Sequence, residues 1–214
     1  MSTPFLSVVM PVHGGGDWLE AALASIQADS RDDMEIIIRD STPGGSRIDV
    51  VERHTSRLHI DYVYMPQMAS WTGKTNLAVK AARGAHVCTL HQDDLWLDGR
   101  LALARETVRR YPDACLFLTP ALIIDETGRK LGDWRPPFRE GPVETAAYRD
   151  ILLVQNSIAI PAPVFRRDAY LAAGGLDESL WYTPDWDCGS NSAIKGVSST
   201  IRVPSRPFAS TAIR

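Results

Sequence analysis

The chain has 214 residues, of which 23 are Lys or Arg and 26 are Asp or Glu, and its formal net charge at pH 7 is −3. Without an excess of basic residues it cannot gain much from releasing phosphate counterions, so a strongly basic nucleic-acid binder is excluded and no nucleic-acid partner is expected. The chain has three cysteines, Cys88, Cys115 and Cys188, which are too few and too scattered for a disulfide framework or a CxxC zinc site. This cysteine content fits a reduced, cytoplasmic setting.

Neither a targeting segment nor a transmembrane segment is expected. A signal peptide starts with basic residues, and the first Lys or Arg here is Arg31. The most apolar run, residues 114–124, is too short to span a bilayer and contains a proline. These features exclude membrane spanning for this chain and leave peripheral association with the inner face of a membrane open.

Apolar runs alternate with helical patterns over the first 120 residues. The runs are continuously apolar, which is typical of strands buried on both faces of a parallel sheet. The expected strands are residues 6–11, 34–39, 60–65, 86–91 and 114–119. The expected helices are residues 18–26 with Asp17 as N-cap, 75–82 and 101–108. Such alternation indicates right-handed βαβ units and an α/β sandwich.

The pattern is less regular after residue 120. Residues 125–128, Asp-Glu-Thr-Gly, are a turn signal between two apolar runs and predict a hairpin. The remaining expected elements are a loop at 135–142, a helix at 144–154, an apolar stretch at 158–165 and a helix at 167–173 that ends at Gly174–Gly175. With no repeat or linker visible, the prediction is a single domain, residues 1–214, with a regular first half that is like nucleotide-binding folds (1–120) and an irregular half (121–214).

Two glycine motifs resemble phosphate-binding loops and depart from them. Gly14–Gly16 follows the first strand, but a dinucleotide-binding fingerprint would need its third glycine at Leu19. Gly73–Thr75 lies between a strand and a helix, but a P-loop would need a glycine at Met68, where backbone amides turn around the phosphates. A dehydrogenase is therefore disfavoured, and a P-loop protein is kept only as an alternative.

Acidic residues stand where expected strands end. Asp40 follows the second strand, and Asp93 and Asp94 follow the fourth. Open α/β sheets bind ligands outside the carboxyl ends of their strands, so these side chains are expected at one site. Adjacent carboxylates there repel each other and favour a hard divalent cation shared with a diphosphate. Taken alone, Asp94 as a helix N-cap and Asp40 as part of an Asx turn remain alternatives.

The motifs, in their order along the chain, resemble family 2 glycosyltransferases of the GT-A fold. The matching segments are Ser7–His13, Ile37–Ser41, Gly73–Gly84, Leu90–Asp94, Phe165–Arg167, Gly174–Glu178 and Asp185–Asp187. The resemblance covers about residues 5–213. It implies an α/β fold of the GT-A type, a Rossmann-like three-layer α/β/α sandwich with a mostly parallel central sheet, whose second half, residues 121–214, binds the acceptor.

The resemblance also implies a donor site. Pro11, Val12, His13 and Asp40 would border the nucleotide base and ribose, and Asp93 would lie beside the ribose and the diphosphate. Within Gly73–Gly84, Asn76 keeps the asparagine of the family motif. Thr75 replaces the arginine that often precedes it, so Lys74 is expected to take over a phosphate contact.

For catalysis, the resemblance implies that Asp94 binds Mn²⁺ or Mg²⁺ directly and that Asp185 is the general base. Asp187 lies two residues from Asp185, so both could face the site in an extended segment but would diverge at the start of a helix. Arg39 and Pro184 depart from the family's acidic residues at these positions. Aromatic side chains of the second half are candidates for stacking on sugar rings: Trp134, Trp181, Tyr182 and Trp186.

The implied activity is inverting transfer of a sugar from a nucleotide-diphospho-sugar, with a UDP-sugar as the first donor to expect, to a hydroxyl of a carbohydrate or lipid-linked acceptor. Such a reaction belongs to the synthesis of cell-surface polysaccharides, glycolipids or other glycoconjugates, and the lack of a QxxRW signature indicates a single transfer. Two alternatives remain: a P-loop-like kinase or NTPase that uses Lys74 and Asp93, and a catalytically inactive sugar-nucleotide-binding protein. Family members often continue beyond the position of Arg214, which leaves open a truncated acceptor-binding half.

Overall fold

The structure is a computed structural model that describes residues 3–29, 33–180, 183–185, 187, 200–202 and 211–213. The helices of this part are α1 Gly16–Gln27, α2 Ile48–Glu52, α3 Trp71–Ala81, α4 Arg100–Arg110, α5 Thr145–Leu152 and α6 Arg167–Ala173. The strands are β1 Leu6–Val12, β2 Met34–Asp40, β3 Ile60–Tyr64, β4 His86–Thr89, β5 Leu95–Trp96, β6 Leu116–Leu118, β7 Ala121–Ile124, β8 Lys130–Trp134, β9 Gly141–Val143, β10 Val164–Arg166, β11 Thr200–Arg202 and β12 Thr211–Ile213.

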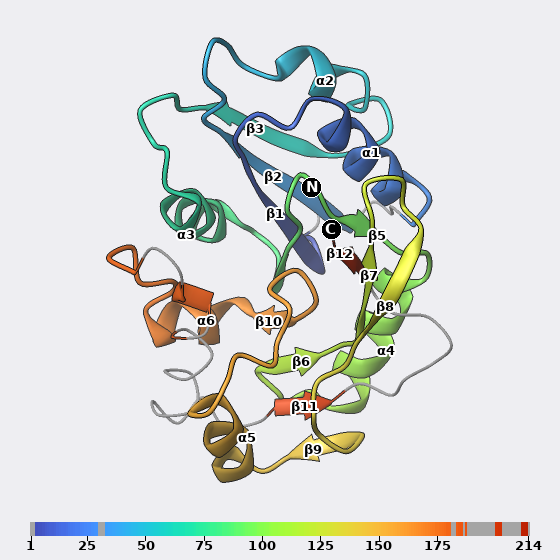
Figure 1. The fold of residues 1–214 in the computed structure, drawn as a ribbon, viewed down its shortest axis with the longest axis vertical. Helices are drawn as coiled ribbons and strands as arrows, with labels where there is room; N and C mark the ends of the chain where they lie inside the picture. The colour runs from blue at the N-terminus through green and yellow to red at the C-terminus, as the bar shows by residue number, and fades with distance from the viewer. Residues whose placement is uncertain are drawn as a thin grey trace.

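A central sheet connects the two halves of the chain. Its strand order is β3-β2-β1-β4-β10-β6-β11-β9, and a second sheet has the order β5-β12-β7-β8. β3, β2, β1 and β4 pair in parallel, whereas β10 runs antiparallel to both β4 and β6. Figure 1 shows the central sheet extending from β3 at the top to β9 at the bottom. The predicted mostly parallel sheet is confirmed.

Helices cover both faces of the central sheet because successive strand residues point to opposite sides. Val8 and Met10 belong to one core together with apolar residues of α1, α2 and α4. Val9, between them, belongs to a second core with residues of α3 and α6. The three-layer α/β/α arrangement inferred from the sequence is therefore present.

The start of α1 differs from the prediction. Its N-cap is Gly15, and Asp17 lies in the first turn of the helix. The preceding turn holds Gly14, Gly15 and Gly16 at φ values of 98°, 77° and 44°, a left-handed conformation that residues with a Cβ rarely adopt. The glycines thus set where the helix begins, and Asp17 instead places a negative charge near its positive end.

Most elements of the second half form where their local signals stand. β7 and β8 are the predicted hairpin, α5 lies within the predicted helix at 144–154, and α6 ends at Gly174 with φ 98°. None of the helices in the described ranges is long and apolar enough to cross a membrane. Trp181, Tyr182, Trp186 and Cys188 lie outside the described residues.

Candidate functional site

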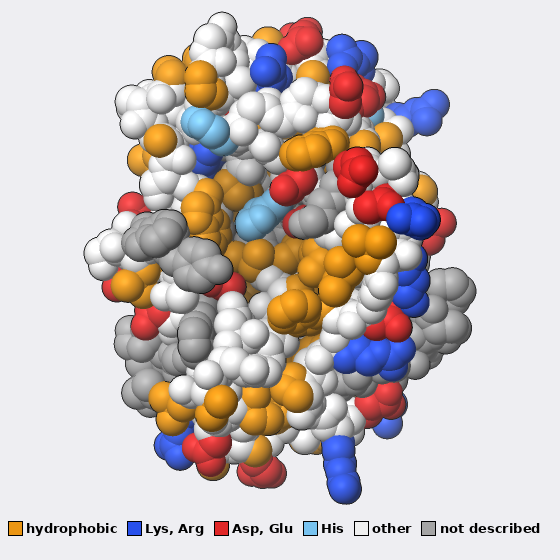
Figure 2. All heavy atoms as spheres, viewed as in Figure 1, with side chains coloured by type: hydrophobic (Ala, Val, Ile, Leu, Met, Phe, Trp, Pro, Cys, Tyr) orange, Lys and Arg blue, Asp and Glu red, His pale blue; other side chains and the backbone are white. Residues whose placement is uncertain are grey.

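The carboxyl ends of β1, β2 and β4 meet at one edge of the sheet. Val12 pairs with Asp40 across β1 and β2, and β4 leads into His91–Asp94 beside them. Figure 2 shows a hollow in the centre of this face, floored by hydrophobic side chains, with acidic and His side chains along its upper border. The chain therefore has a recessed edge with titratable groups where α/β folds bind ligands.

Asp40 is fully buried and holds the end of β2 in place. Its Oδ1 accepts hydrogen bonds from the backbone N of Thr42 at 2.8 Å and from the Thr42 hydroxyl at 2.5 Å. Its Oδ2 accepts from the backbone N of Arg47 at 2.8 Å and from the Tyr62 hydroxyl at 2.7 Å. Burial, reinforced by this bond to Asp40, raises the pKa of Tyr62 to about 12. Four protein donors thus occupy the carboxylate, and its assignment to the nucleotide base stays a prediction.

Lys74 lies in the first half of α3, with 1% of its surface exposed. Its Nζ donates hydrogen bonds to the backbone O of Val12 and to Oγ of Ser41, both at 2.7 Å. Burial lowers the pKa of Lys74 to about 8, and the nearby Asp40 carboxylate opposes that shift. The ammonium group therefore ties the ends of β1 and β2 together, and a phosphate contact would require breaking these bonds.

We call this set the donor-side network: Val12, Asp40, Ser41, Thr42, Arg47, Tyr62 and Lys74. Gly14 joins it through two backbone bonds, since its N donates to Thr42 Oγ1 at 2.9 Å and its O accepts from Nε of Arg47 at 2.8 Å. The network fixes the loops that follow β1 and β2 against each other.

His13 is exposed above this network, whereas Pro11 and Val12 are buried in β1. The His13 ring Nδ1 lies 3.1 Å from Oγ of Ser41. The Gln92 side chain pairs with the His13 backbone, because its Oε1 accepts from the His13 N at 2.7 Å and its Nε2 donates to the His13 O at 3.1 Å. Of the predicted base and ribose contacts, His13 is the side chain in a position to meet a ligand, and these contacts stay predictions.

Asn76 is buried and connects α3 to the turn after α6. Its Oδ1 accepts from the Tyr170 hydroxyl and from the backbone N of Leu176, each at 2.9 Å. Its Nδ2 donates to the O of Leu176 at 2.8 Å and to Oε1 of Glu178 at 3.0 Å. A Cβ at Gly175 would lie 2.6 Å from Asn76 Oδ1, so this turn requires glycine. The amide is saturated by these partners, which points to a structural role.

The departure at Arg39 has a clear structural reason. Its buried guanidinium donates to Oδ2 of Asp61 on β3 at 2.8 Å. It also donates to the O of Ile38 on its own strand, β2, at 3.0 Å. Arg39 thus joins two neighbouring strands rather than entering the donor-side network.

Three candidate metal ligands lie together after β4. One ligand atom each from His91, Asp93 and Asp94 lies within 4.8 Å of the others, and we call these residues the His91 cluster. Within the described part of the chain, the buried His91 Nε2 has no hydrogen-bond partner. Burial lowers the pKa of His91, against the opposing effect of Asp93 and Asp185, so its ring tends to stay neutral and able to ligate. The cluster brings together the predicted Asp93 and Asp94 and adds His91.

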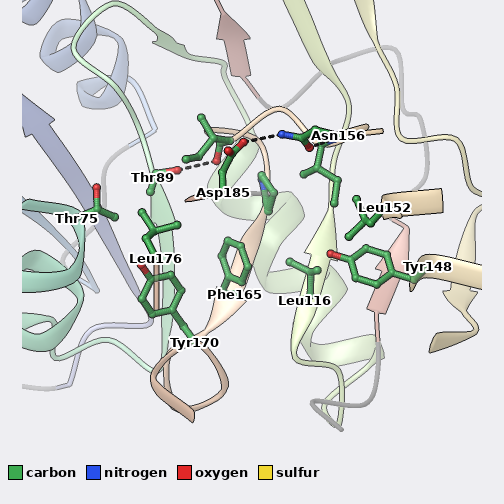
Figure 3. Close-up of a pocket in the computed structure, with 13 residues that line it drawn as sticks. Thr75, Thr89, Leu116, Tyr148, Leu152, Asn156, Phe165, Tyr170, Leu176 and Asp185 are labelled. Carbon is green, nitrogen blue, oxygen red and sulfur yellow. Dashed lines mark hydrogen bonds between the residues drawn. The ribbon is translucent and has the colours of Figure 1, made fainter. Parts of the chain in front are cut away.

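Asp185 lines an apolar pocket (Figure 3). Its charge also acts on His91, where burial lowers the pKa of the ring and Asp185 opposes that shift. Its Oδ2 accepts a hydrogen bond from Nδ2 of Asn156 at 2.7 Å. The pocket lies between the α3/α6 side of the sheet and α5. Its lining is mostly aliphatic and aromatic: Thr75, Thr89, Leu116, Tyr148, Leu152, Asn156, Ile158, Ile160, Pro163, Phe165, Tyr170, Leu176 and Asp185. A carboxylate next to an apolar wall can take a proton from a hydroxyl that is shielded from water.

Asp187 faces a different part of the surface. Its backbone N donates to the O of Thr183 at 3.0 Å, a helical bond, and its side chain lines a polar pocket with Asn76 and Glu178. The two aspartates therefore diverge, as expected for a helical segment. Trp134, proposed as a sugar-stacking residue, donates its Nε1–H to the O of Ser157 at 3.0 Å, and its stacking role stays a prediction.

Sequence reasoning missed His91 and Asn156. His91 stands three residues before Asp94, and its position at the end of a strand was a usable signal. Asn156 carries no local signal, because its partner Asp185 lies 29 residues further along the chain.

Sequence comparison identifies the family. A model of glycosyl transferase family 2 matches residues 7–172. An uncharacterized glycosyltransferase of Methanocaldococcus jannaschii is 23% identical over 191 residues, which cover 87% of this chain and 64% of the relative.

Solved structures agree on the fold. TarS of S. aureus in complex with UDP-GlcNAc superposes with a TM-score of 0.77 at 16% identity, over 98% of this chain and 58% of TarS. The mannosyltransferase PcManGT of Pyrobaculum calidifontis, in complex with GDP-Man and Mn²⁺, superposes with a TM-score of 0.66 at 16% identity, over 96% of this chain and 56% of that one. The chain thus spans under two thirds of these proteins. Its fold is that of GT-A glycosyltransferases, and the chain belongs to glycosyl transferase family 2.

Proposed function

We propose that this chain transfers one sugar, with inversion, from a nucleotide-diphospho-sugar to a hydroxyl of a carbohydrate or lipid-linked acceptor, and that the donor is a UDP-sugar. The observation that carries the proposal is the grouping of His91, Asp93 and Asp94 after β4, next to a pocket that Thr89 at the end of β4 and Asp185 both line. The complexes of TarS with UDP-GlcNAc and of PcManGT with GDP-Man support a sugar nucleotide as donor.

The His91 cluster fits a divalent cation. Two carboxylates and a buried imidazole nitrogen that has no hydrogen-bond partner in the described ranges form a ligand set of mixed oxygen and nitrogen atoms. Carboxylates suit Mg²⁺ and Mn²⁺ alike, whereas Mg²⁺ favours oxygen ligands, so the imidazole favours Mn²⁺. Asp94 and His91 would hold the ion, with Asp93 facing the ribose and diphosphate. A bound divalent cation supplies Lewis-acid stabilisation of the departing diphosphate.

Asp185 is the base in this proposal. Its carboxylate accepts the proton of the acceptor hydroxyl while that oxygen bonds to the anomeric carbon and the bond from this carbon to the diphosphate breaks. Attack from the face opposite the diphosphate inverts the anomeric centre. Proton transfer to a positioned carboxylate contributes about 10²- to 10⁴-fold to such a reaction.

The P-loop alternative is disfavoured by the position of Lys74. A P-loop lysine reaches the phosphates of its ligand. Lys74 Nζ instead donates to Val12 and Ser41 inside the donor-side network. The second alternative, a sugar-nucleotide-binding protein without turnover, predicts ligand binding and no transfer, and is separated from the proposal by the assay below.

The first experiment measures the melting temperature with UDP-, GDP-, dTDP- and CDP-sugars, each with Mn²⁺ and with EDTA. A ligand that binds only the folded state raises the melting temperature, and the expected shift requires Mn²⁺.

The second experiment uses the donor with the largest shift to measure nucleoside diphosphate release by wild type, Asp185→Asn and Asp187→Asn. Asp185→Asn should lower turnover about 10²- to 10⁴-fold and keep the melting shift, because the amide cannot accept a proton. Asp187→Asn should behave as wild type.

Each alternative outcome has a definite meaning. A wild-type melting shift that is equal in Mn²⁺ and EDTA contradicts the metal role. If Asp185→Asn keeps its activity and Asp187→Asn loses it, the general base is Asp187 and not Asp185. Donor binding without turnover by the wild type, in the presence of an acceptor panel of sugars and polyprenyl phosphate sugars, supports the non-catalytic alternative.

A further inference from the structure

Asn156 is the hydrogen-bond partner of Asp185, and its own orientation is fixed by the backbone. Its Oδ1 accepts a hydrogen bond from the N of Ile158, two residues further on, at 3.1 Å. Because the oxygen end of the amide is engaged there, the Nδ2 end faces Asp185 Oδ2 at 2.7 Å. Figure 3 shows this nitrogen directed at the Asp185 carboxylate.

The loop that carries Asn156 is attached to four distant elements through its backbone. Trp134 Nε1 of β8 donates to the O of Ser157 at 3.0 Å, and Thr89 Oγ1 of β4 donates to the O of Ile160 at 2.7 Å. Arg100 Nη2 of α4 donates to the O of Pro161, and Thr119 Oγ1, next to β6, donates to the O of Ala162, both at 2.6 Å. A loop held at this many carbonyls has little freedom, so Asn156 presents its N–H group from a rigid support.

Asp185 has different support. In the part of the chain that the structure describes, Asn156 is the only hydrogen-bond donor to its side chain. One carboxylate oxygen is therefore held, and the other is directed by that same bond. An Asp side chain without this partner is free to rotate about its χ angles.

We propose that Asn156 is the positioning residue for Asp185: its N–H group holds Oδ2 so that Oδ1 meets the acceptor hydroxyl. This inference rests on the proposed function of Asp185 as the base. Asn156 does not touch the reacting atoms, so its loss should lower turnover without changing donor binding. A misplacement of about 1 Å at a reacting group costs about 10²-fold in rate.

Two variants separate positioning from damage to the loop. Asn156→Asp keeps the acceptor for the Ile158 N–H and nearly the same shape, but its ionised carboxylate has no donor for Asp185 and repels it. Asn156→Ala removes both bonds. Gln155→Ala, a change at the exposed neighbouring residue, is the matched control. With the donor identified by the melting screen, both Asn156 variants should lower kcat about 10²-fold with KM for the donor unchanged, and Gln155→Ala should change neither.

The decisive measurement is a double-mutant cycle with Asp185→Asn. If Asn156 acts through Asp185, Asn156→Ala should lower kcat by less than twofold in the Asp185→Asn background. A full 10²-fold loss in that background, or wild-type turnover by Asn156→Asp, overturns the inference while the role of Asp185 stands. Normal turnover by Asp185→Asn alone overturns the proposed base instead. Where Asn156→Ala fails to fold, as its melting temperature would show, the cycle is run with Asn156→Asp.

Discussion

Asp40 and Asp185 are carboxylates at the same edge of the sheet, yet their surroundings differ. Asp40 is fully buried and accepts four hydrogen bonds from the donor-side network. Asp185 accepts one, from Asn156, within the described residues. A carboxylate offers about four acceptor positions, so Asp40 has used its capacity on the protein and Asp185 has not. In the proposed function, the donor-side network is the wall of the site, and the His91 cluster and Asp185 carry its chemistry.

The largest effect on stability is expected from Asp40→Ala. The change leaves the N–H of Thr42 and the Tyr62 hydroxyl without their acceptor in a buried place, while the N–H of Arg47 keeps only its bond to the Tyr62 oxygen. It should lower the free energy of unfolding by about 4 kcal/mol. Urea unfolding measures this. Asp49→Ala, at a carboxylate with 70% of its side chain exposed, is the control and should change stability by less than about 0.5 kcal/mol. If Asp40→Ala is as stable as the control and loses nucleotide binding, Asp40 belongs with the reactive groups and the contrast fails.

Substitutions in the His91 cluster are expected to change metal binding, whereas Asp40→Ala is expected to change stability. Asp94→Ala and His91→Ala should each weaken Mn²⁺ binding in the presence of UDP by at least about 10- to 100-fold, the loss typical of residues that support a metal site. The electron paramagnetic resonance signal of free Mn²⁺ measures this affinity. Asp98→Ala, at an exposed acid four residues after Asp94, should bind Mn²⁺ as the wild type does. Unchanged Mn²⁺ affinity in His91→Ala would mean that the imidazole is not a ligand and that the carboxylates alone bind the ion.

A smaller effect should follow from the pH dependence of Lys74. Its folded-state pKa of about 8 lies below the ordinary 10.5, so between these values the unfolded chain binds more protons than the folded one. Stability attributable to Lys74 therefore rises with pH across this window. The free energy of unfolding of wild type minus that of Lys74→Met should increase by about 2 kcal/mol from pH 8 to pH 10. A flat difference would mean that Lys74 is exposed to solvent or ligand, contrary to its place in the donor-side network.

The sequence predicts well those elements whose signals are local. The apolar run of β1, the turn between β7 and β8 and the Gly174 end of α6 each lie within a few residues of the structure they determine. α2, with five residues, is too short to show a helical period and was not predicted. β11 and β12 have three residues each and exist only through pairing with distant strands. The single-domain division of residues 1–214 stays a prediction.

For the site, the sequence predicts which residues reach the same edge of the sheet, but it does not predict where their side chains point. The βα alternation sufficed to bring Asp40, Asp93 and Asp94 to one edge. Lys74 and Asn76 lie in the expected helix, but no sequence pattern shows that their polar ends are satisfied by Val12, Ser41 and the turn after α6. Contacts made across 33 to 100 residues determine these roles, and a single sequence does not display them.

The pairing of β12 links the loop that carries the His91 cluster to the order in which the chain can fold. β5 directly follows Asp94, and its partner in the second sheet is β12, where Thr211 Oγ1 donates to the O of Leu95 at 2.8 Å across 116 residues. β12 also pairs with β7, so it closes the second sheet from the middle. Closing loops of this length is slow because their entropy is lost before any contact compensates it. During synthesis on the ribosome, β1, β2 and β4 have all their mutual partners long before Leu95 meets its own. The donor-side network can therefore mature early, whereas the segment that follows the His91 cluster becomes a strand only after residue 213 has emerged.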